Sequence, residues 1–398
     1  MKKILNKVQE FILSAAGFTT TVIMLLIIVF LFKNGLSLFN ERPLEEPTAI
    51  VTSANVKNRQ LTDNELKRIF DADIANWKEV GGDDKDIVIV TLDNIVADVS
   101  EEKLGANMEH LSSVIDEYFL TKEDAICFFP EKYLDKHFPG KVLTIKKITP
   151  LHFVSEKEWF PTAKPVAQLG VLPLLLGTLW VSFGAILLAL PLGLMVAIFL
   201  SEIASPRVKS LLKPLIELLA GIPSVVYGFF GLVVLVPLVQ KLFKLDVGET
   251  ALTGSIILAI MALPTIISIA EDAINSVPKV VREASLALGA NSWQTIYKVV
   301  IPYASSGISA AVVLGIGRAM GETMAVLMVT GNAAVIPHSF LQPVRTIPAT
   351  IAAELGEAPN GGLHFKALFA LACILFLLTM LFNIYVNYIK NKNRNAKG

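Results

Sequence analysis

Two ionisable side chains lie four residues apart inside an otherwise apolar run. Between Ala310 and Asn332 the charged residues are Arg318 and Glu322. A guanidinium is permanently charged, and its parallel N–H groups match the oxygens of an anion such as phosphate. A charge in the membrane interior costs about 2.5 to 3.5 kcal/mol on insertion scales, so such residues usually face a polar path or a partner. The pair predicts an anion path, in which Glu322 holds Arg318 until an anion arrives.

The same spacing has a purely structural interpretation. Residues i and i+4 share one face of a helix, so Arg318 and Glu322 could neutralise one another and lock neighbouring helices together. Gly315, Gly317 and Gly321 leave room either for close helix packing or for a solute. Both interpretations stay open, and we include Thr323, which follows Glu322, in the predicted path.

The elements that must hold these residues are membrane helices. The chain has 398 residues, of which 53% are hydrophobic and 18% charged, which is too apolar for an ordinary soluble enzyme. A hydrocarbon layer about 30 Å thick needs about 20 apolar residues in a helix. Six runs meet this requirement, at 10–32, 170–200, 214–240, 250–277, 306–330 and 367–390. We therefore expect an all-α membrane protein with six transmembrane helices.

The basic residues set the expected topology. They gather before the first run, after the second, after the fourth and at the end of the chain: Lys2, Lys3, Lys7, Arg207, Lys209, Lys213, Lys279, Arg282, Lys298, Lys390, Lys392, Arg394 and Lys397. By the positive-inside rule these segments, and hence both termini, are cytoplasmic. The first run stays uncharged from Phe11 to Phe32 with no small-residue cleavage pattern after it, so we expect an anchor and not a signal peptide.

An acidic segment separates the first two runs and is expected outside the membrane. Residues 49–51 and 87–90 are typical of strands, the second of them buried, and Thr62 with Glu65 forms a capping pattern at a helix start. We expect a small α/β lobe at about 45–150. Cys127 lies in this lobe and Cys373 in the last run, so they cannot form a disulfide. The net charge of +0 gives no sign of nucleic-acid binding.

The loop at 278–303, on the cytoplasmic side, is amphipathic. Gly289 can adopt the left-handed conformation that other residues resist, which predicts a helix, a turn and a second helix. We expect Pro302 to close this loop before the next span. Nearby Glu271, near the end of the fourth run, is expected to be solvated or paired at an interface.

This loop resembles the coupling loop of ABC importer permeases. The matching residues are Glu283, Ala284, Ser285, Gly289, Ile301 and Pro302, with Ser in place of a second Ala and Ile in place of the family's Leu. The resemblance implies the type I permease fold and docking of the loop on an ATPase subunit. The chain has no G-x-x-x-x-G-K-[ST] phosphate loop of its own. We therefore expect a permease that is not an enzyme and binds no cofactor, with ATP and Mg used by the partner.

A narrower resemblance connects 317–326 and 220–232 to the PstC permease subunits of phosphate importers. It implies phosphate import across a bacterial inner membrane through Arg318 and Glu322. The expected partners are a PstA-like second permease, two ATP-binding subunits, an extracytoplasmic phosphate-binding protein and membrane lipid. Gate or packing roles are both open for the residues that carry the match: Gly221, Pro223, Ser224, Tyr227, Gly317 and Gly321.

Part of the lobe resembles a periplasmic phosphate-binding protein, at 61–82 and 124–135. That family's Ser-Gly-Thr turn is absent, and Asp93 follows the second strand where its charge would repel phosphate. We expect a relic or docking module that has lost the site. Two alternatives for the whole chain remain, which are a permease for sulfate or molybdate and a membrane sensor with a ligand-detecting lobe.

The expected parts are thus a cytoplasmic tail and first span at 1–40, the lobe at 45–150, a permease core at 165–390 and a basic cytoplasmic tail at 391–398.

Overall fold

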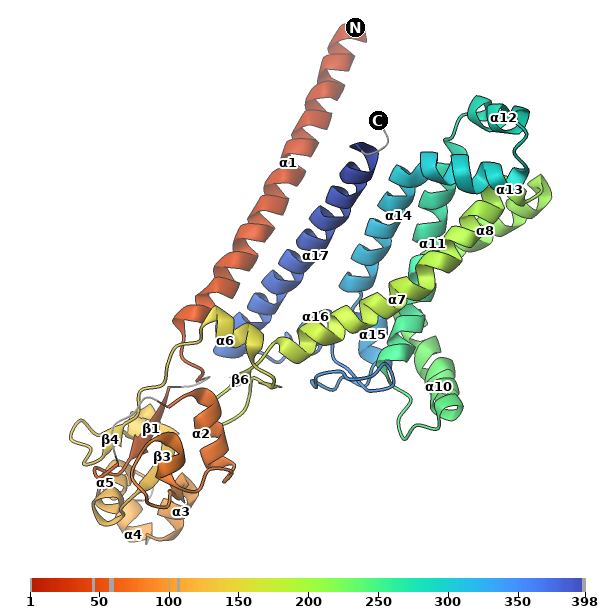
Figure 1. The fold of residues 1–398 in the computed structure, drawn as a ribbon. Helices are drawn as coiled ribbons and strands as arrows, with labels where there is room; N and C mark the ends of the chain where they lie inside the picture. Colours follow the sequence, from red (N-terminus) through yellow and green to blue (C-terminus); the bar gives the residue numbers. More distant parts are fainter. Residues whose placement is uncertain (1, 45–46, 57–60, 100, 106–107, 396–398) are drawn as a thin grey trace. The chain divides into compact units, whose positions relative to one another are not determined.

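The computed structural model describes residues 2–44, 47–56, 61–99, 101–105 and 108–395. Its contacts form two compact units, Met1–Val171 with Ala358–Ala370, and Leu172–Glu357 with Leu371–Gly398 (Figure 1). The end of the expected basic tail, including Lys397, lies outside the described residues.

Within the described part of the chain, six helical segments are long and apolar enough to cross a membrane, as predicted. They are Glu10–Asn40, Leu172–Ile203, Ser224–Phe243, Ala251–Asn275, Ser292–Gly321 and Leu363–Val386. The first consists of α1 (Lys2–Ser37) and the short helix η1 (Leu38–Asn40), and the last belongs to α17 (Leu363–Asn395).

The core of the second unit, hereafter the membrane unit, is built around α11 (Ala251–Asn275). It packs against α7 (Leu172–Ile198) and α14 (Ile301–Gly321). Its most apolar window is 61% buried, whereas no other span exceeds 33%. Small residues allow the close approach, because a Cβ on Gly184 of α7 would come within 2.4 Å of the Ser255 hydroxyl of α11. The fourth apolar run therefore supplies the centre of the unit.

The third apolar run, predicted as one helix from residue 214, is broken in the structure. Helix α8 (Pro206–Gly221) ends before Ile222, and the span itself consists of α9 (Ser224–Phe230), a π-helical turn at Gly231–Leu235 and α10 (Val236–Phe243). Ile222 is extended, with ψ 128°. A residue before proline avoids the helical region, so Pro223 explains the break.

The fifth run is also broken, where a continuous helix from 306 to 330 was predicted. Helix α14 ends at Gly321, Glu322 is extended with ψ 133°, and α15 (Met324–Val329) follows. Glu322 Oε1 accepts a hydrogen bond from Ala325 N at 3.5 Å. A carboxylate is favourable near a helix N-terminus, and Glu322 lies two residues before the first residue of the new helix, Met324. Helix α16 (Ile347–Glu354) completes the unit.

The α/β lobe of the first unit contains a four-stranded sheet in the order β2-β3-β1-β4. The strands are β1 (Thr48–Thr52), β2 (Val88–Val90), β3 (Ala125–Pro130) and β4 (Lys141–Val142). Only β2 and β3 pair in parallel. The strands at 49–51 and 87–90 were predicted, but β2 lies at the edge, where Val88 is exposed and Val90 buried, so the expected burial holds for only part of this strand.

The first unit contains further helices and short elements. They are α2 (Asp63–Phe70), η2 (Trp77–Val80), α3 (Leu92–Ala97), α4 (Glu101–Leu104), α5 (Leu111–Thr121), η3 (Glu131–Tyr133), α6 (Pro150–Ser155), β5 (Trp159–Phe160) and β6 (Gln168–Leu169). The predicted cap of α2 is present, with Glu65 N donating to Thr62 Oγ1 and Thr62 N donating to Glu65 Oε2.

Candidate functional site

Arg318 lies in the last turn of α14 and is half-buried. Its Nη1 donates a hydrogen bond to Thr265 Oγ1 of α11 at 3.3 Å. Tyr227 of α9 is within electrostatic range of the guanidinium. Since a guanidinium has five N–H donors, one long hydrogen bond to a neutral hydroxyl leaves most of its binding capacity unused.

Arg318 and Glu322 form no ion pair among the residues that the structure describes. The i, i+4 spacing had suggested that the two side chains share a helix face. They do not, because α14 ends at Gly321. The interpretation of Arg318 and Glu322 as an internal ion pair is therefore wrong for this conformation. The same holds for the prediction that Glu322 holds Arg318 until an anion arrives. The Thr323 hydroxyl donates to Gly321 O at 3.3 Å across the break.

One face of α14 is open within the membrane unit. A Cβ added at Gly317 or Gly321 would have no atom within 4 Å, whereas at Gly315 it would meet Ile266 at 2.9 Å. Gly315 is thus a packing glycine, and Gly317 and Gly321 face space that this unit does not fill. We call Gly317 and Gly321 the open face of α14.

The break between α8 and α9 is held by Tyr227. Its side chain is buried, and its hydroxyl donates to Leu219 O at 2.8 Å, a carbonyl near the end of α8. Pro223 precedes α9, and Ser224 is its first residue. A Cβ added at Gly221 would meet no atom within 4 Å. For Tyr227 this geometry favours packing, while Gly221 remains compatible with either a gate or packing role.

The coupling loop, residues 278–303, has the predicted helix-turn-helix. Helix α12 (Lys279–Ala287) ends two residues before Gly289, whose φ of +87° is left-handed, and α13 (Ser292–Thr295) follows with its own capping box. Ser285 and Thr295 share a buried hydrogen bond of 3.0 Å between their hydroxyls. The serine that departs from the family pattern therefore joins the two helices of the loop. Glu283 and Ala284 are exposed.

The far end of the loop differs from the prediction that Pro302 closes it. Helix α13 runs through a π-helical turn at Ile296–Val300 directly into α14, where Ile301 and Pro302 form the first turn. Proline is tolerated in a first helical turn because its missing N–H needs no partner there. Movement of α13 would thus be transmitted along one continuous helix to Arg318.

Arg282 anchors the loop to the membrane helices. Its Nη2 donates to Glu202 Oε1 at 2.8 Å and to Ile274 O at 2.7 Å, and Nη1 donates to Val277 O. Sequence reasoning used Arg282 only as a topology signal. Its partner Glu202, 80 residues away, gave no local signal.

Glu271 joins α11 to α8 through ion pairs whose partners were not predicted from the sequence. It is 1% exposed in α11, and its carboxylate lies 2.9 Å from Lys209 Nζ and 3.4 Å from Lys213 Nζ of α8. Pairing was one of two expected outcomes. The spacing of the two lysines, four residues apart on an amphipathic helix, was the available signal.

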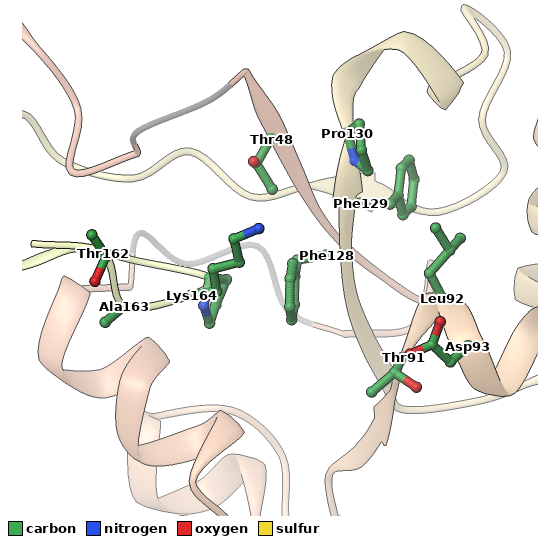
Figure 2. A pocket seen from close by; sticks show the side chains of 11 residues that line it. Thr48, Thr91, Leu92, Asp93, Phe128, Phe129, Pro130, Thr162, Ala163 and Lys164 are labelled. Atoms are coloured by element: carbon green, nitrogen blue, oxygen red, sulfur yellow. The ribbon is translucent and has the colours of Figure 1, made fainter. Parts of the chain in front are cut away.

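The lobe has a cavity of about 430 Å³ near the carboxyl end of β2 (Figure 2). Thr91, Asp93, Phe128 and Lys164 are among its lining residues. Thr91 and Asn94 form a capping box, with Asn94 N donating to Thr91 Oγ1 at 3.2 Å. The cavity is lined by both the Asp93 carboxylate and the Lys164 ammonium, and the lack of a phosphate site there stays a prediction.

Comparison with known proteins places the membrane unit in a family. The family described as binding-protein-dependent transport system inner membrane component matches residues 189–395. The chain is 41% identical over 250 residues to the probable ABC transporter permease protein YqgH of Bacillus subtilis, covering 63% of this chain and 81% of that protein. It is 40% identical over 256 residues to the phosphate transport system permease protein PstC of Mesorhizobium japonicum, covering 60% and 77%.

Among solved structures, an inward facing MetNI methionine ABC transporter covers 55% of this chain and 93% of its own, with 19% identity and a TM-score of 0.44. The matched residues include the second half of the span Leu172–Ile203 and all of the four spans that follow it. The chain therefore belongs to the family of binding-protein-dependent transport system inner membrane components.

Proposed function

We propose that this chain is a permease subunit that imports inorganic phosphate by alternating access. The observation that carries the proposal is Arg318, a half-buried guanidinium in a membrane helix that, within the described ranges, donates one hydrogen bond, to Thr265. Among the described residues no carboxylate pairs with it. An oxyanion can therefore take up its free N–H groups without first displacing a charged partner. The similarity to proteins named as phosphate permeases supports phosphate as the anion.

The open face of α14 supports the same path. Gly317 and Gly321 flank Arg318, and a Cβ added at either would have no neighbour within 4 Å. Glycine at these positions gives a solute or a second permease subunit access to the backbone beside the guanidinium. Glu322 and Thr323, at the break that follows, would line the path on the side toward α15.

The energy would come from a separate ATPase that uses ATP and Mg and docks on the coupling loop. The loop exposes large apolar side chains, among them Leu288 at 90% and Trp293 at 65%. Such a surface fits a protein groove better than water. Arg282 and the continuous α13–α14 helix would pass its movement to Arg318. The assembly would contain a PstA-like second permease, two ATPase subunits and a phosphate-binding protein, with both termini of this chain in the cytoplasm.

The test is phosphate uptake by the complete assembly carrying Arg318→Gln. We expect uptake to fall more than tenfold while basal ATP hydrolysis, which reports assembly, is retained. The matched control is Arg207→Gln, because Arg207 is an exposed arginine of α8. That variant should transport normally.

Competition by sulfate and molybdate in the same assay tests the choice of anion. Phosphate uptake that persists at the wild-type rate in Arg318→Gln would contradict the path. Strong inhibition by sulfate or molybdate, at concentrations equal to phosphate, would instead favour a permease for another oxyanion.

A further inference from the structure

Helix α6 (Pro150–Ser155) packs one apolar side chain on the lobe and leaves two others uncovered. Phe153 is 1% exposed, whereas Leu151 is 80% exposed and Val154 is 38% exposed. His152 is partly buried between them, with Nε2 3.1 Å from Asp63 Oδ1. A helix surrounded by water usually packs its apolar stripe on the protein. The exposure of Leu151 and Val154 therefore indicates that this side of α6 is not in water.

The exposed residues form one continuous face. With 3.6 residues per turn, Pro150, Leu151 and Val154 fall within about 100° of one another around the helix. Phe153 projects on another side and is 1% exposed, so the inward side is well packed. We call Pro150, Leu151 and Val154 the α6 face.

Contacts inside the first unit fix α6 at the end of two membrane spans. The Phe153 ring lies 5.9 Å from the ring of Phe39, which is in η1 at the end of the first span. Ile148 N donates to Glu41 O at 3.1 Å, and Glu41 Oε1 lies 2.7 Å from Lys366 Nζ, near the start of α17. The charges of Glu41 and Lys366 mark the level at which the apolar spans end. The α6 helix is attached at that level.

We propose that the α6 face lies in the lipid interface on the lobe's side of the bilayer and anchors the lobe to the membrane. The first span likewise has an apolar surface that the chain leaves uncovered, because its most apolar window is 0% buried within the chain. Exposed Lys146, Lys147 and Lys157 flank α6 in the sequence. Lysines beside an interfacial apolar face are attracted to anionic headgroups.

The experiment places a spin label on the α6 face of the full chain. Leu151→Cys is labelled and reconstituted in vesicles of phosphatidylethanolamine and phosphatidylglycerol. Collisions of the label with oxygen, which concentrates in lipid, are compared with collisions with a water-soluble nickel chelate. The native thiols give little background, since Cys127 and Cys373 are both buried. Burial also raises the pKa of the Cys127 thiol to about 12.

The matched control is Leu120→Cys, a leucine of α5 that is 72% exposed. Helix α5 lies at the end of the lobe away from α6 (Figure 1). We expect the ratio of oxygen to nickel collisions to be at least several times higher at position 151 than at position 120. Val154→Cys should give the same pattern as Leu151→Cys.

Two results would overturn the proposal. Equal nickel collisions at positions 151 and 120 would show that the α6 face is in water. Low collision rates with both reagents at position 151 would show that protein, and not lipid, covers it.

Discussion

The α/β lobe and the membrane unit differ in how much of their apolar surface the chain itself covers. In the lobe, alternate residues of β1 and β3 supply two cores, one containing Val51 and Cys127 and the other Ile50 and Ile126. In the membrane unit, α11 alone has a mostly buried apolar window, and the other spans leave most of theirs exposed. Exposed apolar side chains are thus fewer in the lobe than in the spans, as expected for helices whose apolar surface a lipid bilayer can cover.

Buried charge differs between the two regions in the same way. The membrane unit holds Glu271 between two lysines and Arg282 against Glu202. In the lobe, Glu65 caps a helix and the Lys78–Asp84 ion pair is exposed. Removing a charge from low-dielectric surroundings costs more than removing one from water. Both regions therefore contain partly buried ion pairs, such as Lys85 with Asp124 in the lobe, but the most deeply buried carboxylate among the described pairs is Glu271 of the membrane unit.

The largest effect expected is the loss of unfolding free energy when a buried side chain of the lobe is removed. Phe129 is 1% exposed, so Phe129→Ala should cost about 3–5 kcal/mol of unfolding free energy. Amide hydrogen exchange of β1 and β3, measured in the full chain, should become more than a hundredfold faster. Leu120→Ala, on the exposed side of α5, should change exchange little. Similar protection in both variants would mean that the lobe is not the closed core described here.

Two glycines of α14 lie on different faces of the helix, one packed and one open. Gly315→Ala would press a Cβ against buried Ile266, which should cost about 1–3 kcal/mol and lower the thermal unfolding midpoint. Gly317→Ala meets no atom within 4 Å, so the midpoint should not fall, yet uptake should decrease if a solute or partner uses the open face. Normal uptake in Gly317→Ala would show that the open face is unused.

A substitution at Gly289 of the coupling loop changes the backbone conformation without disturbing side-chain packing. Gly289 has φ +87° and a Cβ added there would meet no atom within 4 Å, so Gly289→Val introduces strain of about 1–2 kcal/mol but no collision. We expect fewer phosphate ions transported per ATP hydrolysed by the reconstituted assembly. Gly356→Val is the control, because Gly356 is equally open and has no positive φ. An unchanged ratio in Gly289→Val would exclude a role for the turn.

The smallest effect expected concerns a charge in the lobe. Burial, and to a lesser extent the neighbouring Asp135 charge, raises the pKa of Asp116 above its ordinary value of 3.8. The folded lobe thus favours the protonated acid, and this contribution to stability is present at low pH and lost as pH rises through the folded pKa. Asp116→Asn should slow hydrogen exchange of the lobe slightly at pH 7 relative to the wild type. The difference should shrink toward pH 4, and a constant difference would rule out this titration.

Much of the fold could be predicted from the sequence because it depends on local properties. The six spans follow from runs of apolar residues, the capped start of α2 from Thr62 and Glu65, and the left-handed turn from Gly289. Each of these depends on residues within a few positions of one another. The family resemblance rested on equally local motifs, and the similarity of residues 189–395 to the matched family confirmed it.

Tertiary structure alone decided where apolar helices break and which polar groups meet. Apolar residues lie on both sides of Gly321 and of Ile222, so runs of apolar residues did not reveal the ends of α14 and α8. Arg318 meets Thr265, 53 residues away, instead of Glu322 four residues away. The reason is that spacing determines partners only while a helix is continuous. Once Glu322 leaves the helix, the packing of α14 on α11 selects the hydrogen bond that Arg318 makes.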